Sequence, residues 1–132
     1  MPATKAALAL VVEDEDPVRE LLTEVLWSEG YSTAEARDSR QAIELLDEMI
    51  LPSEIPCVVL LDMLLPQASG LGVLDHLKER GADVPVVAMS ASGPALAAAR
   101  SAGTQATLAK PFDLDQLVAV VDSYSDVVAA QR

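Results

Sequence analysis

The stretch Cys57-Val58-Val59-Leu60-Leu61-Asp62-Met63-Leu64-Leu65-Pro66 is an apolar run that contains a single charge, the carboxylate of Asp62. A continuous apolar run of this length predicts a strand that is buried on both of its faces. Pro66 and Gly70 then stop and turn the chain. Asp62 is therefore expected at the carboxyl end of a buried strand, where open α/β sheets place their ligands. We expect Asp62 to carry the chemistry of the chain.

Strand and helix patterns alternate outward from this stretch in both directions. Apolar segments predict strands at residues 8–12, 31–36, 57–62, 84–89 and 106–109. Apolar residues at helical spacing predict helices at residues 17–29, 39–50, 70–80, 95–102 and 114–124. Strict alternation with short connections implies right-handed crossovers and helices on both faces of one sheet. The sequence therefore predicts an α/β fold, a doubly wound (βα)5 domain with a five-stranded parallel sheet.

Capping residues mark the ends of the first two helices. Asp16 followed by Pro17 predicts the start of the first helix, with the Asp16 carboxylate as its N-terminal cap. Gly30 is expected to end that helix in a left-handed conformation. Asp38 and Ser39 predict the cap of the second helix.

Composition limits the kinds of partner that the chain can bind. The 132 residues carry a formal net charge of −12, so nucleic acid phosphates would be repelled and direct binding to DNA or RNA is not expected. Cys57 is the only cysteine, which excludes an intramolecular disulfide and fits a reducing cytoplasm. No stretch approaches the roughly 18 apolar residues of a membrane helix, so no membrane association is expected. We expect one cytoplasmic domain over residues 1–132, with its core at 8–124 and residues 125–132 forming either a tail or an extension of the last helix.

Polar residues lie at or just past the carboxyl ends of four predicted strands: Glu13 and Asp14, Asp62, Ser90, and Lys110. Because parallel strands end at the same edge of a sheet, these residues are expected to meet in one shallow pocket. Three neighbouring carboxylates repel each other unless cations lie among them. Lys110 is one such cation, and a divalent ion is another. An all-oxygen site without His or Cys favours Mg²⁺ or Mn²⁺ over zinc.

Four short motifs at these strand ends together resemble the receiver domain of two-component response regulators. The motifs are Val11-Val12-Glu13-Asp14, Leu60-Leu61-Asp62 followed by Pro66, Ser90-Ala91, and Lys110-Pro111-Phe112. The resemblance extends from Leu8 to Tyr124. It implies the flavodoxin-like strand order 2-1-3-4-5. It also implies a signal transduction module, in which aspartyl phosphorylation within a phosphorelay controls protein–protein contacts.

The resemblance implies a role for each residue that handles the phosphoryl group. Asp62 resembles the phosphoacceptor, which takes a phosphoryl group from a phosphohistidine of a histidine kinase or phosphotransfer protein. Ser90 resembles the hydroxyl residue that binds the phosphoryl group after transfer. Lys110 resembles the lysine that pairs first with the acceptor carboxylate and then with the phosphate, and its bond to Pro111 is expected to be cis. Such a pocket acts by positioning the nucleophile and supplying cations, because the transition state spreads charge over the phosphoryl oxygens.

For the metal, the resemblance implies four ligands. They are the carboxylates of Glu13, Asp14 and Asp62 and the backbone carbonyl of Leu64. The expected ion is Mg²⁺, with Mn²⁺ as the alternative. Glu13 stands where Asp is more usual, so we expect its extra methylene to change how directly it reaches the metal.

The predicted output side departs from the family at three points. Receivers commonly carry Tyr or Phe three residues before the lysine, and here that position is Thr107. The segment between Ser90 and Lys110 is slightly shorter than usual, and the helix within it is rich in alanine. We expect Asp62 to be phosphorylated, but the usual coupling between the hydroxyl and the aromatic residue to be absent or rewired.

The predicted function is that of a regulatory module, which catalyses only its own phosphorylation and dephosphorylation and is not a true enzyme. It is either a stand-alone receiver or part of a larger regulator or hybrid kinase, a monomer or a weak dimer, with a downstream protein as its second partner. The alternative is a degenerate receiver that binds proteins independently of phosphorylation. A phosphatase of the haloacid dehalogenase type would need a second Asp at position 64, where the chain has Leu64. The phosphate of a flavin would be repelled by the acidic run at residues 13–16.

Overall fold

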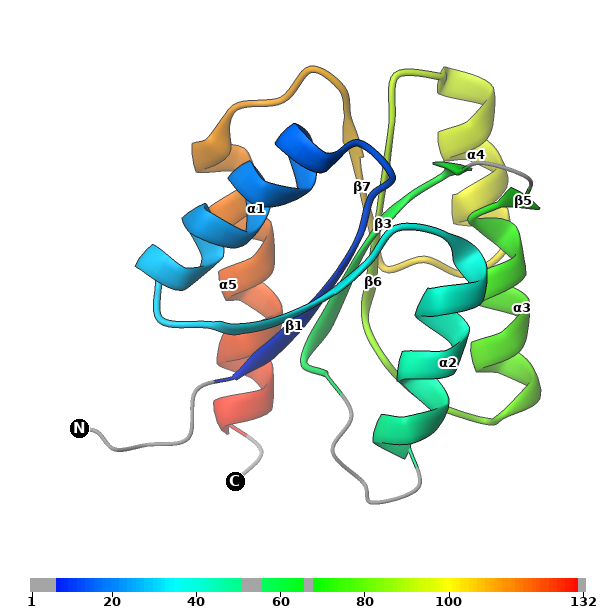
Figure 1. Ribbon diagram of the computed structural model, residues 1–132, viewed down its shortest axis with the longest axis horizontal. Helices are drawn as coiled ribbons and strands as arrows, with labels where there is room; N and C mark the ends of the chain where they lie inside the picture. The colour runs from blue at the N-terminus through cyan, green and yellow to red at the C-terminus, as the bar shows by residue number, and fades with distance from the viewer. Residues whose placement is uncertain (1–6, 51–55, 66–67, 131–132) are drawn as a thin grey trace.

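Five parallel strands form the centre of the computed structural model, which describes residues 7–50, 56–65 and 68–130 (Figure 1). They are β1 (Leu8–Val12), β2 (Ser32–Ala36), β3 (Val58–Asp62), β6 (Val86–Ser90) and β7 (Ala106–Ala109). Their spatial order is β2-β1-β3-β6-β7, which is 2-1-3-4-5 when the strands of this sheet are numbered along the chain. The predicted parallel sheet and its strand order are therefore confirmed.

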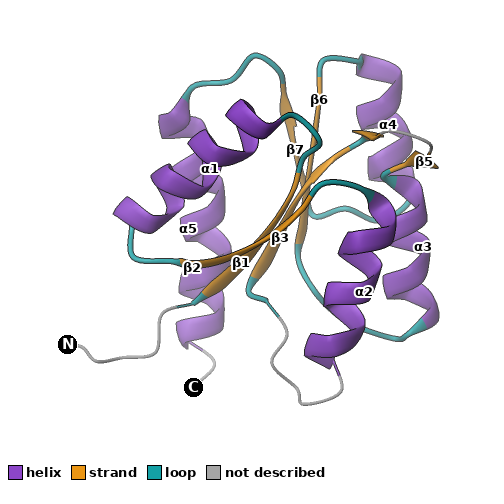
Figure 2. Cartoon of the chain, viewed as in Figure 1, coloured by secondary structure: helices purple, strands orange, loops and turns teal. Residues whose placement is uncertain are grey.

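Helices cover both faces of this sheet (Figure 2). On one face lie α1 (Asp16–Ser28) and α5 (Leu114–Ala130). On the other lie α2 (Ser39–Ile50), α3 (Leu71–Glu79) and α4 (Gly93–Ser101). In the part of the chain that the structure describes, no helix has the length and apolar character needed to span a bilayer.

Each face of the sheet packs on a separate apolar core, because successive side chains of a strand point to opposite faces. In β3, Val59 and Leu61 belong to the core shared with α2, α3 and α4. Val58 and Leu60 belong to the core shared with α1 and α5. All five residues of β3 are buried, as the apolar run predicts. The backbone that carries Asp62 is thus held from both sides.

The start of α1 differs from the prediction. The cap position is Glu15, which makes no capping hydrogen bond with its side chain, and Asp16 is the first residue of the helix. The Asp16 carboxylate accepts a hydrogen bond from the guanidinium of Arg19. The predicted Asp16 cap is therefore wrong, because a charged donor three residues along the helix holds the carboxylate that would otherwise accept from the backbone.

Three other local predictions are confirmed. The Asp38 carboxylate caps α2 by accepting a hydrogen bond from the Gln41 N–H at 2.8 Å. Gly30 follows α1 with a φ of 95°, in the left-handed region that glycine tolerates. The peptide bond between Lys110 and Pro111 is cis.

A short hairpin, which the sequence pattern does not predict, follows β3. Its strands β4 (Leu64–Leu65) and β5 (Ala68–Ser69) pair antiparallel. Pro66, at the end of the apolar stretch, lies outside the described residues. The chain returns to β3 at Gly70, where an added Cβ would lie 3.1 Å from the carbonyl oxygen of Asp62 and 2.9 Å from Sδ of Met63. The absence of a side chain at Gly70 allows the hairpin to close against the strand that carries Asp62.

Candidate functional site

The sheet brings the predicted site residues to one edge. Its register places Asp62 beside Met89 and Ser90 beside Ala109. The residues that directly follow β1 and β7 reach the same edge, because all of these strands are parallel. Polar groups that are far apart in the sequence therefore converge through the topology of the sheet alone.

Asp62 lies at the centre of this edge, with its side chain 7% exposed. Its Oδ1 accepts a hydrogen bond from the Leu64 N–H at 3.0 Å, and its Oδ2 lies 3.4 Å from Nζ of Lys110. A carboxylate can accept about four hydrogen bonds in total. Asp62 is therefore oriented by two donors and keeps lone pairs that can bind a metal or attack an electrophile.

Lys110 is shared between Asp62 and a second buried carboxylate, that of Glu13. Its Nζ lies 2.8 Å from Oε1 of Glu13, closer than it lies to Asp62. Glu13 is fully buried, and its Oε2 accepts a hydrogen bond from the Glu15 N–H at 3.3 Å. The side chain of Glu13, one methylene longer than that of Asp, thus reaches the ammonium group of Lys110, the residue that directly follows β7.

The ionisation of the two shared groups follows from their burial and their charges. Burial raises the pKa of Glu13 above its ordinary value, the hydrogen bond from Lys110 opposes this effect, and the charge of Asp62 adds to it. Burial acts to lower the pKa of Lys110, but the hydrogen bond to Glu13 and the charge of Asp62 outweigh it, so the pKa of Lys110 is raised. Lys110 therefore stays protonated at neutral pH. One ammonium serves two buried carboxylates, which leaves room for a second cation.

Glu13, Asp14 and Asp62 form a group that fits a divalent ion. Each offers one carboxylate oxygen, and these oxygens all lie within 4.8 Å of one another. Glu13 and Asp62 are buried, whereas Asp14 is exposed and opens the group to solvent. Hard oxygen ligands suit Mg²⁺ and Mn²⁺. Leu64 lies beside the group and donates its N–H to Asp62, but the role of its carbonyl as a ligand stays a prediction.

Ser90 lies at the end of β6 and is almost completely buried. Its Oγ accepts a hydrogen bond from the Ser92 N–H at 3.0 Å. Its backbone carbonyl accepts a hydrogen bond from the Lys110 N–H at 2.8 Å, which ties the lysine to the neighbouring strand end. The structure thus places Ser90 at the predicted edge, and its contact with a phosphoryl group stays a prediction.

The model of the response regulator receiver domain family matches residues 9–122 of the chain. The chain belongs to this family. The matched span contains every predicted site residue of the receiver, from Glu13 to Lys110. Response regulators are signalling proteins of two-component systems, and their receiver domains interact with histidine kinases or phosphotransfer proteins. Receiver domains generally use Mg²⁺ at an acidic pocket, and this receiver has the acidic group described above.

Individual relatives match more than four fifths of this receiver but differ in their own length. Response regulator MprA of Mycolicibacterium vanbaalenii is 38% identical over 112 residues, which cover 83% of this chain and 46% of that protein. Sporulation initiation phosphotransferase F of Bacillus subtilis is 34% identical over 117 residues, which cover 87% of this chain and 90% of that protein. The receiver domain of NtrX from Brucella abortus has a crystal structure that matches with a TM-score of 0.78 and 31% identity, covering 88% of this chain and 96% of that domain. The chain thus spans less than half of MprA and nearly all of the phosphotransferase.

This receiver has a polar contact at Thr107, where an aromatic residue is common. The Thr107 Oγ1 accepts a hydrogen bond from Nη2 of Arg100 at 2.8 Å, which joins β7 to α4. The pair is exposed, so it contributes little to stability. The output face of the receiver is therefore polar at this position, and a rewired coupling to the phosphoryl site stays a prediction.

Arg19 is a residue of the receiver site that sequence reasoning misses. Its side chain is 11% exposed, and its Nη1 donates a hydrogen bond to the backbone carbonyl of Glu13 at 2.9 Å. The signal is nevertheless present in the sequence, because Arg19 falls at helical spacing with Leu22 and Leu26 on the buried side of α1. A charged residue within an apolar stripe indicates a buried polar partner.

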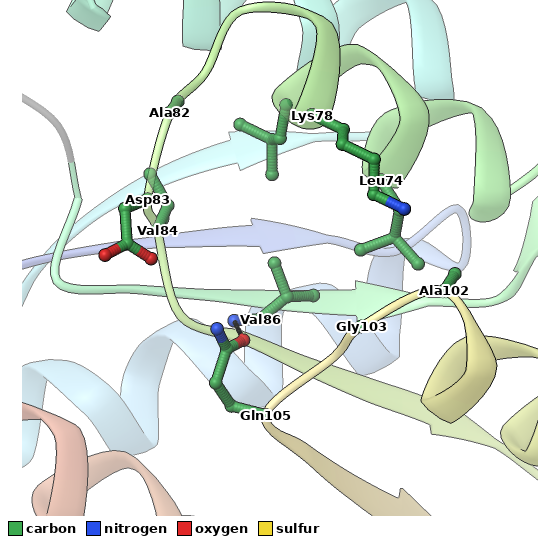
Figure 3. A pocket seen from close by; sticks show the side chains of 10 residues that line it. Leu74, Lys78, Ala82, Asp83, Val84, Val86, Ala102, Gly103 and Gln105 are labelled. Atoms are coloured by element: carbon green, nitrogen blue, oxygen red, sulfur yellow. Dashed lines mark hydrogen bonds between the residues drawn. The ribbon is translucent and has the colours of Figure 1, made fainter.

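The receiver also has a hollow away from this site, with a volume of about 160 Å³ (Figure 3). Leu74, Val84 and Val86 line it, and Lys78 extends from α3 beside Leu74. Val86 begins β6, whereas the site lies where the strands end, so the hollow is at the opposite edge of the sheet. None of the predicted site residues is among those that line it.

Proposed function

We propose that the chain is a phospho-accepting signalling module, in which Asp62 receives a phosphoryl group from a phosphohistidine of a partner kinase or phosphotransfer protein. The observation that carries this proposal is the environment of Asp62. It is a buried carboxylate with one oxygen held by the Leu64 N–H and the other 3.4 Å from the Lys110 ammonium. A relative of similar length is named a phosphotransferase, which supports group transfer as the reaction.

In the proposed step, an oxygen of the Asp62 carboxylate attacks phosphorus while the bond between phosphorus and the imidazole nitrogen breaks. The imidazole leaves with the electron pair of that bond and is protonated by solvent. The Lys110 ammonium compensates the charge of the transferred oxygens, and the Ser90 hydroxyl donates a hydrogen bond to one of them. Hydrolysis of the acyl phosphate by water releases inorganic phosphate and restores the carboxylate, so the signal is temporary.

The acidic group is the proposed metal site. Glu13, Asp14 and Asp62 would hold Mg²⁺ together with the carbonyl of Leu64, and Mn²⁺ is the alternative ion. When bound, the ion supplies positive charge to the transferring phosphoryl oxygens. The support is the clustering of three carboxylate oxygens, from Glu13, Asp14 and Asp62, of which Glu13 and Asp62 share the single ammonium of Lys110.

A groove beside the pocket is the proposed docking site of the phosphodonor. It has a volume of about 380 Å³ and lies between α1 and the segment that precedes α5. Leu21 and Leu114 line it and are 48% and 38% exposed, so it offers apolar side chains to a partner. Lys110 and Glu15 line it as well, so a helix in the groove would bring its histidine close to Asp62. The net charge of −12 favours a donor with basic residues around that histidine.

The wider proposals concern the module as a whole. Residues 1–132 are proposed to form one receiver domain with its core at 8–124, acting through a downstream protein as a monomer or a weak dimer. The module would catalyse only its own phosphorylation and dephosphorylation. A degenerate receiver that acts without phosphorylation is not favoured, because the carboxylates, the hydroxyl and the lysine that transfer requires all lie at one edge of the sheet.

Intact-mass measurement after incubation with Mg²⁺ and a small phosphodonor such as phosphoramidate tests the proposal. The wild-type chain should gain the mass of one phosphoryl group, and this gain should disappear with EDTA or in Asp62→Asn. Asp75→Asn is the matched control, because Asp75 is exposed on α3, outside the acidic group of the site. No incorporation into the wild type, or equal incorporation into Asp62→Asn, would overturn the proposal.

A further inference from the structure

Arg19 is a charged residue held within the buried side of α1. Its guanidinium donates hydrogen bonds to three acceptors from three parts of the chain. Nη1 bonds the carbonyl of Glu13 at 2.9 Å, Nε bonds Oε1 of Glu35 at 3.2 Å, and Nη2 bonds Oδ1 of Asp16 at 2.5 Å. Arg19 thus joins the end of β1, the first turn of α1 and the edge strand β2.

The contact with Glu13 completes the attachment of that residue's backbone. The Glu13 N–H already donates a hydrogen bond to the carbonyl of Ala36 at 3.0 Å. With its carbonyl held by Arg19, both backbone groups of Glu13 have fixed partners. The direction in which the Glu13 side chain leaves the backbone is therefore set by β2 and α1, before any contact with Lys110 or Asp62.

This attachment opposes a strong repulsion. Residues 13–16 are four consecutive acids, and the first two lie next to the carboxylate of Asp62. Like charges at such short range push the loop away from β3. The guanidinium is always charged, and two carboxylates, those of Asp16 and Glu35, already compensate it. It can therefore hold the loop through a backbone carbonyl without acting as the counterion of the site.

We propose that Arg19 is a positioning residue for the metal-binding pair, which it fixes by holding the Glu13 carbonyl so that Glu13 and Asp14 face Asp62. The inference rests on the proposed function in assuming that this acidic group binds Mg²⁺. Residues that orient metal ligands through hydrogen bonds typically change metal affinity by about 10–100-fold when they are replaced. Arg19 acts one step further from the metal, because it holds the backbone of the loop that carries two of the ligands.

Calorimetric titration of the phosphate-free chain with Mg²⁺ tests the inference without any phosphotransfer. Arg19→Ala should weaken Mg²⁺ binding by about 10-fold or more. The affinity of Arg19→Lys should lie between those of the wild type and Arg19→Ala, because lysine keeps a charged donor group but loses the planar fork of the guanidinium. Leu26→Ala is the control, since Leu26 is fully buried on the same helix near its other end. It should lower the urea midpoint while leaving Mg²⁺ affinity at the wild-type value.

The outcomes separate the inference from the proposed function. If Arg19→Ala binds Mg²⁺ as tightly as the wild type, the positioning role is overturned and the phosphoacceptor proposal stands. If Arg19→Ala does not fold, Arg19→Lys decides, and wild-type affinity in that variant overturns the role. If the wild type binds Mg²⁺ but takes up no phosphoryl group, the proposed function fails while the affinity ratio still decides on Arg19. If the wild type binds no Mg²⁺, the positioning role is overturned, and phosphoryl uptake still decides on the proposed function.

Discussion

Two glycines at the start of α3 are expected to respond oppositely to the same substitution. At Gly70 an alanine Cβ would lie 3.1 Å from the carbonyl oxygen of Asp62 and 3.1 Å from Cγ of Leu61, which is closer than ordinary contact. At Gly72 an added Cβ meets nothing within 4 Å. Gly70→Ala should therefore push the chain away from β3, whereas Gly72→Ala should not.

The change in the free energy of unfolding at each glycine is the sum of backbone, capping and packing contributions. The φ of Gly70 is −61°, so alanine there has no backbone strain. Alanine reduces the entropy of the unfolded chain, which favours it by about 0.4–1 kcal/mol, and it is a poorer residue than glycine at a helix cap, which disfavours it by a similar amount. These terms offset, so overpacking decides, and it costs about 1–3 kcal/mol. Gly72→Ala replaces glycine in the first turn of the helix and should stabilise the fold by about 0.4–1 kcal/mol.

Urea unfolding followed by far-ultraviolet circular dichroism measures both effects. With a urea dependence of about 2 kcal/mol per molar, the Gly70→Ala midpoint should fall by roughly 0.5–1.5 M and the Gly72→Ala midpoint should rise by roughly 0.2–0.5 M. The two variants control for each other, because they make the same chemical change two positions apart on one helix. A Gly70→Ala midpoint at or above that of the wild type would show that the hairpin does not close tightly on β3, and the packing argument would be wrong.

Three further predictions concern charge, output and docking. The pKa of Glu13 is raised above 4.5, so the stability that its protonated form contributes is present below pH 4.5 and is lost as the pH rises through the folded pKa. The urea midpoints of Glu13→Gln and the wild type should therefore agree below pH 4.5. They should separate at higher pH, where the variant should be the more stable of the two. A difference that does not depend on pH would contradict this. Thr107→Val removes the acceptor of Arg100 and should cost about 1 kcal/mol or less in urea unfolding, with unchanged phosphorylation by phosphoramidate; a larger loss would mean that the contact is structural. Leu21→Asp should slow transfer from a phosphorylated protein donor at least about tenfold, because it places a charge in the apolar docking groove, but it should leave transfer from phosphoramidate unchanged; equal slowing with both donors would place the defect in the pocket.

The fold and most of the site can be predicted from the sequence because they depend on patterns with a clear period. The apolar run of β3 is buried on both faces, and the alternation of strands and helices leads to the observed strand order. Once the strands are parallel, the positions after them must lie at one edge. The convergence of Glu13, Asp62, Ser90 and Lys110 therefore follows from topology rather than from any local property of these residues.

Three local features cannot be predicted from the sequence: the cap of α1, the hairpin of β4 and β5, and the partner that Lys110 prefers. Asp16 has the pattern of a helix cap, but Arg19 takes its carboxylate, and neither residue alone indicates that choice. The hairpin of β4 and β5 has two residues in each strand, too few for a period to be recognised. The preference of Lys110 for Glu13 over Asp62 depends on distances of 2.8 and 3.4 Å, which no motif specifies.

The placement of β3 between two separate cores has a consequence for how this protein can change over evolution. Val58 and Leu60 pack against one layer of helices, and Val59 and Leu61 pack against the other. Because protein interiors are closely packed and transmit strain, a substitution in either layer changes the packing of β3 and so moves the residue that ends it. Substitutions in the interior can therefore change the position of Asp62, and under the proposed function its reactivity, without replacing any residue of the pocket. Two receivers with identical site residues can therefore differ in the geometry of the site, because their cores differ.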